Sequence, residues 1–600
     1  MRIRVPWVVF LLLIPLLIAP AEARQASTVS GTITNSLSGD TVPNAVVVVE
    51  SPSFSKQVRT GPDGKFTIRD VPPGAYHLVV RADGFLPSRT EVTVKEAALA
   101  ADVWINPQLH FTEVMSVSPE GRNQFESFQA TNVLGGEELT KELQGTIGAT
   151  LETQPGIAVR SFGPGPARPV VRGLDGDRVL VVEDGLRMGD LSSQSGDHGV
   201  NVNPASASRI EVVRGPATLL YGANAIGGLV NVITREIPDA PVTTATGSFS
   251  VDGGTGASEG GAAGDVTLGN GQVAVHFSGS GRRTGDFRSP DGDVPNSFTR
   301  AGYGEAGVAY TGATGYFGGS YAYDRTHYGV PFVEEGETNI DPRRQVFTLR
   351  GEKRNMSGWF DGFRGSFGVR YRHDEKDGEL VATAFENNTT ELALLANHKA
   401  LGRMKGSIGG TFLTRSFSAE GEEALPAPVD QNGFSAYLYE EVAASPHMQI
   451  QFGGRVEHAS FDPAEDLARD FTNVSGSIGL LLLPNDSTTV SFSLARASRN
   501  PALEELYFHG PHPGNNAFEN GDPNLDSEHA LGFDASIRWR GAKASGEVTY
   551  FFNNVGNFIF RELSGAVEDD LLETFFVQGD ARLQGVESHV DLLVSWPSCF

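Results

Sequence analysis

The sequence predicts a mostly β protein whose largest part is a transmembrane β-barrel. Three observations lead to this fold class. Beyond Pro238, apolar and polar residues alternate with period two in many segments, for example at Val490, Phe492 and Leu494, and polar, Gly-rich loops separate these segments. The chain begins like an exported protein, and it contains 72 Gly and 36 Phe. A mean hydropathy of −0.19 alone would indicate a soluble protein, but the strands of a membrane barrel are apolar only on the lipid side.

Residues 1–23 have the three parts of a secretory signal peptide. Arg2 and Arg4 form the charged start, residues 5–18 are the apolar core, and residues 21–23 (AEA) are a small-x-small cleavage site. The core is too short and too close to the N-terminus for a spanning helix. No later stretch approaches ~18 uninterrupted apolar residues, so we expect no membrane helix after processing.

Charge and cysteine content exclude several classes of function. The formal net charge of −26 argues against a nucleic-acid partner, which requires a basic surface, and favours the attraction of cations. Cys599 is the only cysteine, which excludes an intramolecular disulfide and any Cys-rich metal site.

Residues 28–108 read as a small all-β unit. Apolar residues alternate at Tyr76, Leu78 and Val80, and Asp63-Gly64 is a tight-turn signal. The stretch 61–85 (GPDGKFTIRDVPPGAYHLVVRADGF) resembles the carboxypeptidase-regulatory-like β-sandwich. The resemblance implies an N-terminal β-sandwich and says little about function.

Residues 109–132 form a polar linker. Its segment His110-Phe111-Thr112-Glu113 matches the His-x-x-Glu zinc motif of metallocarboxypeptidases. We reject an enzyme on this basis, because no surrounding αβ domain supplies a third ligand and a substrate pocket.

Residues 133–237 combine helical and strand signals. Leu139, Leu143, Ile147 and Leu151 recur at four-residue steps, which predicts an apolar helical stripe that ends at Pro155-Gly156. Residues 209–234 (RIEVVRGPATLLYGANAIGGLVNVIT) read as a strand, a breaker, a Gly-rich turn and a second strand.

This last segment closely resembles the end of the plug domain of TonB-dependent outer-membrane receptors. Residues 170–174, 178–182 and Asp184-Gly185 also occur as in that family and in the same order. The resemblance implies an α+β plug domain over 133–237 inside a β-barrel over 238–600. It also implies a location in the outer membrane of a Gram-negative-type bacterium, with the N-terminal domain periplasmic, and active uptake of a scarce ligand without catalysis or a required cofactor.

The linker segment Thr112-Glu113-Val114-Met115-Ser116-Val117 resembles a TonB box. An extended, β-prone hexapeptide can add as a strand to the sheet of a TonB-type energy-transducing partner. The alternative is an ordinary linker strand.

Three further stretches resemble the zinc-uptake branch of the family: residues 192–200 (SSQSGDHGV), 417–423 (FSAEGEE) and 509–512 (HGPH), together with Tyr328-Gly329-Val330-Pro331. The resemblance implies metal ligands Asp197, His198, Glu422 or Glu423, and His512, with His509 in reserve. Imidazole and carboxylate together suit Zn²⁺, and four such groups complete a tetrahedron. The chain departs from the branch at residues 332–337 (FVEEGE), which are acidic and lack His; carboxylates alone select less between divalent cations.

The main alternative ligand is haem or another metal chelate, such as a siderophore. Haem receptors also place a His between segments resembling 499–503 and 521–525, and Tyr507-Phe508 could form part of a haem wall. A glycan importer shares the sandwich and plug, but it would need clustered aromatic platforms that the sequence does not indicate.

We also expect the barrel to be truncated, that is, incomplete at the C-terminus. The ~360 residues after Pro238 allow about 16 strands at roughly 22 residues for a strand and its connection, whereas the resembling family closes its barrel with about 22 strands. Pro597 interrupts the last strand signal. We therefore predict no continuous pairing between a first strand near Thr243 and a last strand near Trp596.

Overall fold

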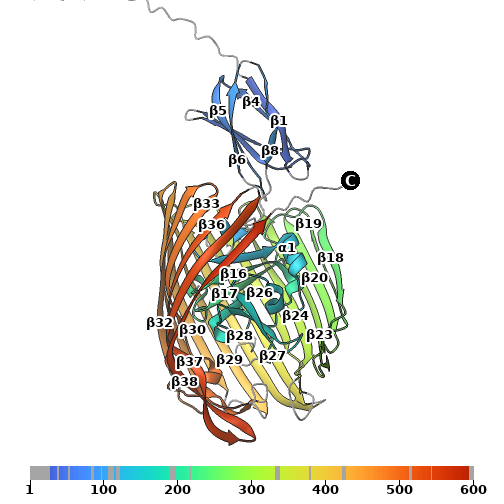
Figure 1. The fold of residues 1–600 in the computed structure, drawn as a ribbon, viewed down its shortest axis with the longest axis vertical. Coiled ribbons are helices and arrows are strands. Elements are labelled where there is room, and N and C mark those ends of the chain that lie inside the picture. The colour runs from blue at the N-terminus through green and yellow to red at the C-terminus, as the bar shows by residue number, and fades with distance from the viewer. Residues whose placement is uncertain are drawn as a thin grey trace, which may run out of the picture. The chain divides into compact units, whose positions relative to one another are not determined.

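The computed structural model describes residues 27–36, 39–51, 54–82, 85, 87–95, 97–105, 114–115, 122–189, 191, 197–216, 218–331, 338–377, 380–421, 428–512, 517–541 and 543–592. The chain divides into two compact units, Met1–Gln108 and Leu109–Phe600 (Figure 1). Within the described ranges, no helix is both long enough and apolar enough to cross a bilayer.

The first unit is the expected β-sandwich. One sheet contains β1 (Ser27–Asn35), β4 (Lys65–Val71), β7 (Leu99–Ala100) and β8 (Val103–Ile105), and the other contains β2 (Val46–Ser51), β3 (Phe54–Arg59), β5 (Gly74–Arg81) and β6 (Ser88–Val94). Phe66 and Ile68 from the first sheet pack with Val47, Leu78 and Val80 from the second. Period-two alternation thus gives each sheet one apolar face, and the two faces form the core.

The linker is described only in part. β9 (Val114–Met115) pairs antiparallel with β10 (Arg122–Asn123). Thr112, Glu113, Ser116 and Val117 of the predicted TonB box lie outside the described residues, as do the signal peptide and His110.

The second unit begins with an α+β plug. Its five-stranded sheet has the order β11 (Thr131–Gly135), β16 (Ala207–Arg214), β17 (Gly228–Thr234), β14 (Val179–Glu183) and β15 (Leu186–Arg187), and β12 (Ile157–Ser161) and β13 (Ala167–Val171) form a hairpin. The helices are α1 (Gly136–Glu142), α2 (Ile147–Leu151) and α3 (Thr218–Tyr221), with 3-10 turns η1 (Gln124–Glu126), η2 (Gly176–Arg178) and η3 (Pro204–Ser206).

The predicted helical stripe is two helices, not one. Leu143 already has non-helical ψ at the end of α1, and the Thr146 side chain caps α2 by accepting from the Ala149 N–H. A helix-capping residue in the middle of an apolar stripe starts a new helix. The four-residue spacing of apolar residues therefore does not indicate one continuous helix across Leu143 and Thr146.

The barrel wall is a 19-stranded sheet that surrounds the plug in Figure 1. Three of its strands are short: β25 (Thr338–Ile340), β34 (His509–His512) and β35 (Ala517–Asn520). The long strands of the described sheet number 16, as estimated from the chain length. They are β18 (Thr246–Gly254), β19 (Glu259–Gly269), β20 (Val273–Thr284), β23 (Thr299–Gly312), β24 (Gly315–Gly329), β26 (Arg343–Lys353), β27 (Phe360–Asp377), β28 (Leu380–His398), β29 (Met404–Gly421), β30 (Val429–Ser445), β31 (Met448–Pro463), β32 (Arg469–Asn485), β33 (Thr488–Arg499), β36 (Glu528–Arg540), β37 (Ala544–Glu568) and β38 (Leu571–Leu592).

The two faces of the wall differ as the alternation predicts. On β20, Val273 and Phe277 are exposed outward, whereas Ala274 and His276 are buried against the interior. Loops at the ends of the wall carry the hairpin of β21 (Arg288–Ser289) and β22 (Gly292–Asp293) and the short helix α4 (Leu503–Tyr507).

The sheet is open in the part of the chain that the structure describes. β18 lies at one end of the strand order and β38 at the other, and no backbone pairing joins them within the described ranges. The predicted last strand near Trp596 lies outside the described residues, so the incomplete barrel stays a prediction.

Candidate metal site between plug and barrel

The structure brings together three of the predicted ligands. Asp197, His198 and His512 each offer one ligand atom, and these atoms all lie within 4.8 Å of one another. The three residues are only 3%, 2% and 4% exposed. Asp197 and His198 belong to the plug segment between β15 and η3, whereas His512 ends β34 in a barrel loop. The cluster therefore bridges the two parts of the second unit.

The separation is close to what a metal ion requires. Zn–N bonds of about 2.0–2.1 Å place tetrahedral ligand atoms about 3.3 Å apart. The ligand atoms, which lie within 4.8 Å of one another, therefore need to approach by at most about 1.5 Å to coordinate an ion.

Hydrogen bonds orient both imidazoles for ligation. His198 Nδ1 lies 3.2 Å from the Leu191 carbonyl oxygen, and His512 Nδ1 lies 3.2 Å from Glu519 Oε2. A carbonyl and an ionised carboxylate can only accept, so each Nδ1 donates and the lone pair of each ring is on Nε2. A carboxylate or carbonyl behind a histidine is the usual support of a metal ligand.

Arg561 helps to keep Glu519 ionised. The Arg561 guanidinium donates to Glu519 Oε1. Burial acts to raise the pKa of the Glu519 carboxyl, but the hydrogen bond from His512, together with Arg561, holds that pKa below its usual value. The carboxylate therefore remains an acceptor for His512 Nδ1–H near neutral pH.

Tyr328 gives the Tyr-Gly-Val-Pro motif a structural role. Its hydroxyl donates to the Asp197 carbonyl oxygen at 2.9 Å and accepts from the Gly199 N–H at 3.2 Å. Tyr328 is 1% exposed near the end of β24. A Cβ at Gly199 would lie 3.1 Å from the Gly165 carbonyl oxygen, so glycine allows the plug loop to pass this closely. The barrel thereby holds the plug loop on both sides of His198.

Aromatic side chains enclose the two histidines. The ring centroids of Phe385 and His198 are 6.0 Å apart, and those of Phe508 and His512 are 5.5 Å apart. Both phenylalanines belong to an apolar cluster at this end of the barrel interior, hereafter the aromatic cluster. Its buried members are Leu191, Phe385, Phe417, Val429, Ala459, Phe461, Phe471, Leu503, Leu506, Tyr507, Phe508, Leu525 and Ile559.

The structure does not bring His509 to the site, which corrects its place as a reserve ligand. His509 is exposed, its Nδ1 lies 2.6 Å from Asn520 Oδ1, and its ring packs edge-on against Phe518. The physical reason is strand geometry: His509 and His512 are three residues apart on β34, so they point to opposite faces. Glu422 and Glu423 lie outside the described residues, directly after the end of β29.

Ion pairs hold the plug within the barrel. Arg172 and Arg214 both donate to Glu587, at 3.0 Å and 2.6 Å, and Arg214 also donates to Glu547 at 2.8 Å. All four side chains are buried. Each pair joins residues more than 300 positions apart, so no local sequence signal could have predicted them.

Comparison with known proteins agrees with this architecture. A family model described as TonB dependent receptor-like, beta-barrel matches residues 267–596, more than half of the chain. The TonB-dependent Receptor Plug Domain matches residues 123–229, and the Carboxypeptidase regulatory-like domain matches residues 28–105. This chain is a TonB-dependent receptor. The fold places it in the outer membrane, and the family consists of receptors and transporters rather than enzymes.

The names of proteins similar to this receptor refer to different ligands. A hemin receptor of Yersinia pestis is 33% identical over 147 residues, which cover 24% of this chain and only 21% of that relative. Among solved structures, the copper transporter OprC has a TM-score of 0.67 at 17% identity, covering 81% of this chain and 78% of its own. The hemophore receptor HasR of Serratia marcescens, solved with its hemophore and heme, has a TM-score of 0.65 at 16% identity, covering 78% and 80%. At these identities the structures show the fold alone.

Proposed function

We propose that this receptor imports a divalent transition-metal ion, foremost Zn²⁺, with Asp197, His198 and His512 as its ligands. One observation carries the proposal: a carboxylate and two imidazoles from the plug and the barrel converge in a buried place. Both imidazoles have Nδ1 engaged by an acceptor, which directs Nε2 to a ligand. A water or a nearby carboxylate can complete the tetrahedron.

The donor set favours a bare cation over an organic ligand. A carboxylate beside two imidazoles suits Zn²⁺, and Cu²⁺ binds such N and O donors more tightly in simple competition. The ligands alone therefore do not make the site selective for zinc, and both ions belong in the test.

The test is titration of the purified full chain with Zn²⁺ and, separately, with Cu²⁺. We expect the His198→Ala/His512→Ala double variant to lose the tight site. His509→Ala is the matched control, because it removes a histidine from the face of β34 opposite His512, and it should bind like the wild type. An unchanged zinc affinity in the double variant would overturn the ligand assignment.

Haem is the second candidate, and two observations favour it. The rings of His198 and His512 are 6.2 Å apart beside the aromatic cluster, and a curated relative is called a hemin receptor. Against haem, Asp197 offers its carboxylate to the same small volume as the two rings, which leaves little room for a porphyrin. Haem added to the metal-free chain should give no His512-dependent absorbance shift. A tight, His512-dependent shift would replace zinc by haem.

Energy for release comes from outside the chain, through a TonB-type partner at Thr112 to Val117. The support is the β9–β10 contact: Val114–Met115 pair with Arg122–Asn123, immediately before η1 and the first plug strand. A strand-like segment in this place can add to the sheet of the partner, and force on it would pass directly to the plug. In this arrangement the N-terminal sandwich lies in the periplasm.

A further inference from the structure

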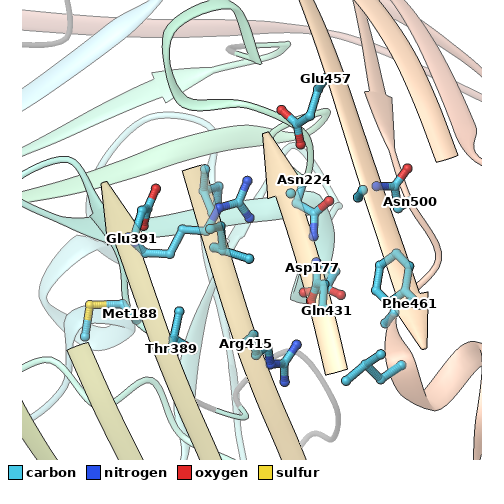
Figure 2. Close-up of a pocket in the computed structure, with 18 of the residues that line it drawn as sticks. Asp177, Met188, Asn224, Thr389, Glu391, Arg415, Gln431, Glu457, Phe461 and Asn500 are labelled. Carbon is cyan, nitrogen blue, oxygen red and sulfur yellow. The ribbon is translucent and has the colours of Figure 1, made fainter. Parts of the chain in front are cut away.

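A partly open cavity of about 170 Å³ lies between the plug and the barrel, next to the aromatic cluster. Figure 2 shows residues that line it, among them Asp177 and Asn224 of the plug and Arg415 and Gln431 of barrel strands. The cavity shares Ala459, Phe461 and Leu503 with the aromatic cluster. The aromatic cluster therefore borders both this cavity and the two histidines. One water needs roughly 10–15 Å³ of such space, so the cavity can hold several.

Glu504 is the unusual residue of this cavity. It is 8% exposed, and its Oε1 has no hydrogen-bond partner among the described residues. A buried polar atom without a hydrogen-bond partner costs free energy, and a ligand in the cavity would supply that partner to Glu504 Oε1. Its neighbour Glu505 is fully engaged, accepting from Arg499 at 2.9 Å and from the Ala502 N–H at 2.8 Å. These bonds fix α4 with Glu504 toward the cavity.

Charges of both signs surround Glu504. Burial raises the pKa of Glu504 to about 7, the negative charge of Asp177 acts in the same direction, and Arg415 opposes them. The other charged groups of the cavity already have partners: Glu457 accepts from Arg455 at 2.9 Å. Arg415 donates to Asn387 at 2.8 Å. Asp177 is 4.0 Å from the Arg499 guanidinium. Glu391, a further carboxylate of the cavity, accepts from the Arg187 N–H at 2.9 Å. Asp177, whose contact with Arg499 is long, and Glu504 therefore retain acceptor capacity for a ligand.

We propose that this cavity is a second binding site for the imported ion, lined by oxygen atoms. In it, Asp177 and Glu504 bind a partly hydrated divalent cation after the cation has left the histidines. The inference rests on the proposed function, because it concerns the next position of the same cargo. Carboxylate, amide and water ligands hold a transition-metal ion more loosely than imidazole does, so the ion can move on. Asp177 belongs to η2 of the plug, whereas Glu504 belongs to α4 of the barrel loops. Movement of the plug would separate the two carboxylates and release the ion.

The experiment is a zinc titration of the full chain by calorimetry, with the bound metal counted after dialysis. The wild type should bind two Zn²⁺, one tightly and one weakly. Glu504→Gln, which keeps the side-chain shape, should keep the tight site and weaken the other at least tenfold. His198→Ala/His512→Ala should keep only the weak site, and adding Glu504→Gln to it should remove that site too. Glu465→Gln, in an exposed loop, is the matched control for the loss of one charge.

The outcomes separate this inference from the proposed function. A tight site that survives in His198→Ala/His512→Ala contradicts the proposed function but still leaves the Glu504-dependent site measurable. If the wild-type protein binds only one Zn²⁺, the proposal of a second binding site is wrong. It is also wrong if Glu504→Gln leaves the weak site unchanged, because that result would assign the weak binding to surface carboxylates. In cells, Glu504→Gln should slow zinc uptake while the tight affinity stays at the wild-type value.

Discussion

Replacing Tyr328 by Phe removes one oxygen atom and should loosen the plug loop that carries the ligands. The hydroxyl makes two buried hydrogen bonds, to the Asp197 carbonyl oxygen at 2.9 Å and from the Gly199 N–H at 3.2 Å. A typical intramolecular hydrogen bond contributes about 0.5–1.5 kcal/mol, so the pair contributes about 1–3 kcal/mol. In the variant the bound ion has to order the loop itself. We therefore expect zinc affinity to fall about 5- to 150-fold.

The assay compares zinc titrations of Tyr328→Phe, Tyr321→Phe and the wild type. Tyr321 lies on the same strand but is 48% exposed, so its variant should bind zinc normally. The amides of the plug segment around His198 should also exchange faster in Tyr328→Phe. Wild-type affinity in Tyr328→Phe would refute the reasoning that the barrel holds the ligand loop through this hydroxyl.

Three further predictions test the site and its coupling. Glu519→Gln replaces the acceptor behind His512 Nδ1 by an amide that can also donate, and zinc affinity should fall about 10- to 100-fold; no change would remove Glu519 from the site. Zinc affinity should drop as the pH falls below about 6, because ordinary imidazoles take up protons near pH 6.5 and a proton competes with the metal. Constant affinity from pH 7.5 to 5.5 would exclude histidine ligands. Deletion of Thr112 to Val117 should abolish uptake and leave zinc titration intact; uptake that survives would separate the segment from energy transfer.

The sequence predicted the fold well where one physical rule governs many residues. Alternation on β20 follows from lipid on one side and plug on the other, and the chain length predicted the number of long strands. Strand length was less predictable. β37 has 25 residues, whereas about 10 span the hydrocarbon core. The last residues of β37 are all exposed, both apolar ones such as Leu563 and Val567 and polar ones, so alternation no longer marks where the strand ends.

The candidate site was predictable only as a set of motifs. Asp197, His198 and His512 could be chosen from their sequence context, and His509 could have been excluded had β34 been recognised as a strand. Glu519 supports His512 because β34 and β35 pair, and this register has no sequence signal. Glu504 would be expected on the surface, as most glutamates are; only the packing of α4 buries it.

In the proposed function, the division of the three candidate ligands between plug and barrel links metal release to plug movement. A site built from the plug loop alone would travel with the plug and keep its ion. Here Asp197 and His198 belong to the plug, whereas His512 belongs to a barrel loop. A metal–nitrogen bond tolerates changes of only about 0.2 Å, so a plug displacement of about 2 Å would already break the coordination to His512. The buried ion pairs of Arg172 and Arg214 with Glu587 resist such a displacement, since breaking a buried pair costs about 3–5 kcal/mol. Under the proposed function, the plug would therefore hold its ion at rest and give it up only under an external force. This is the behaviour required of a receptor that captures its ligand and releases it on the other side of the membrane.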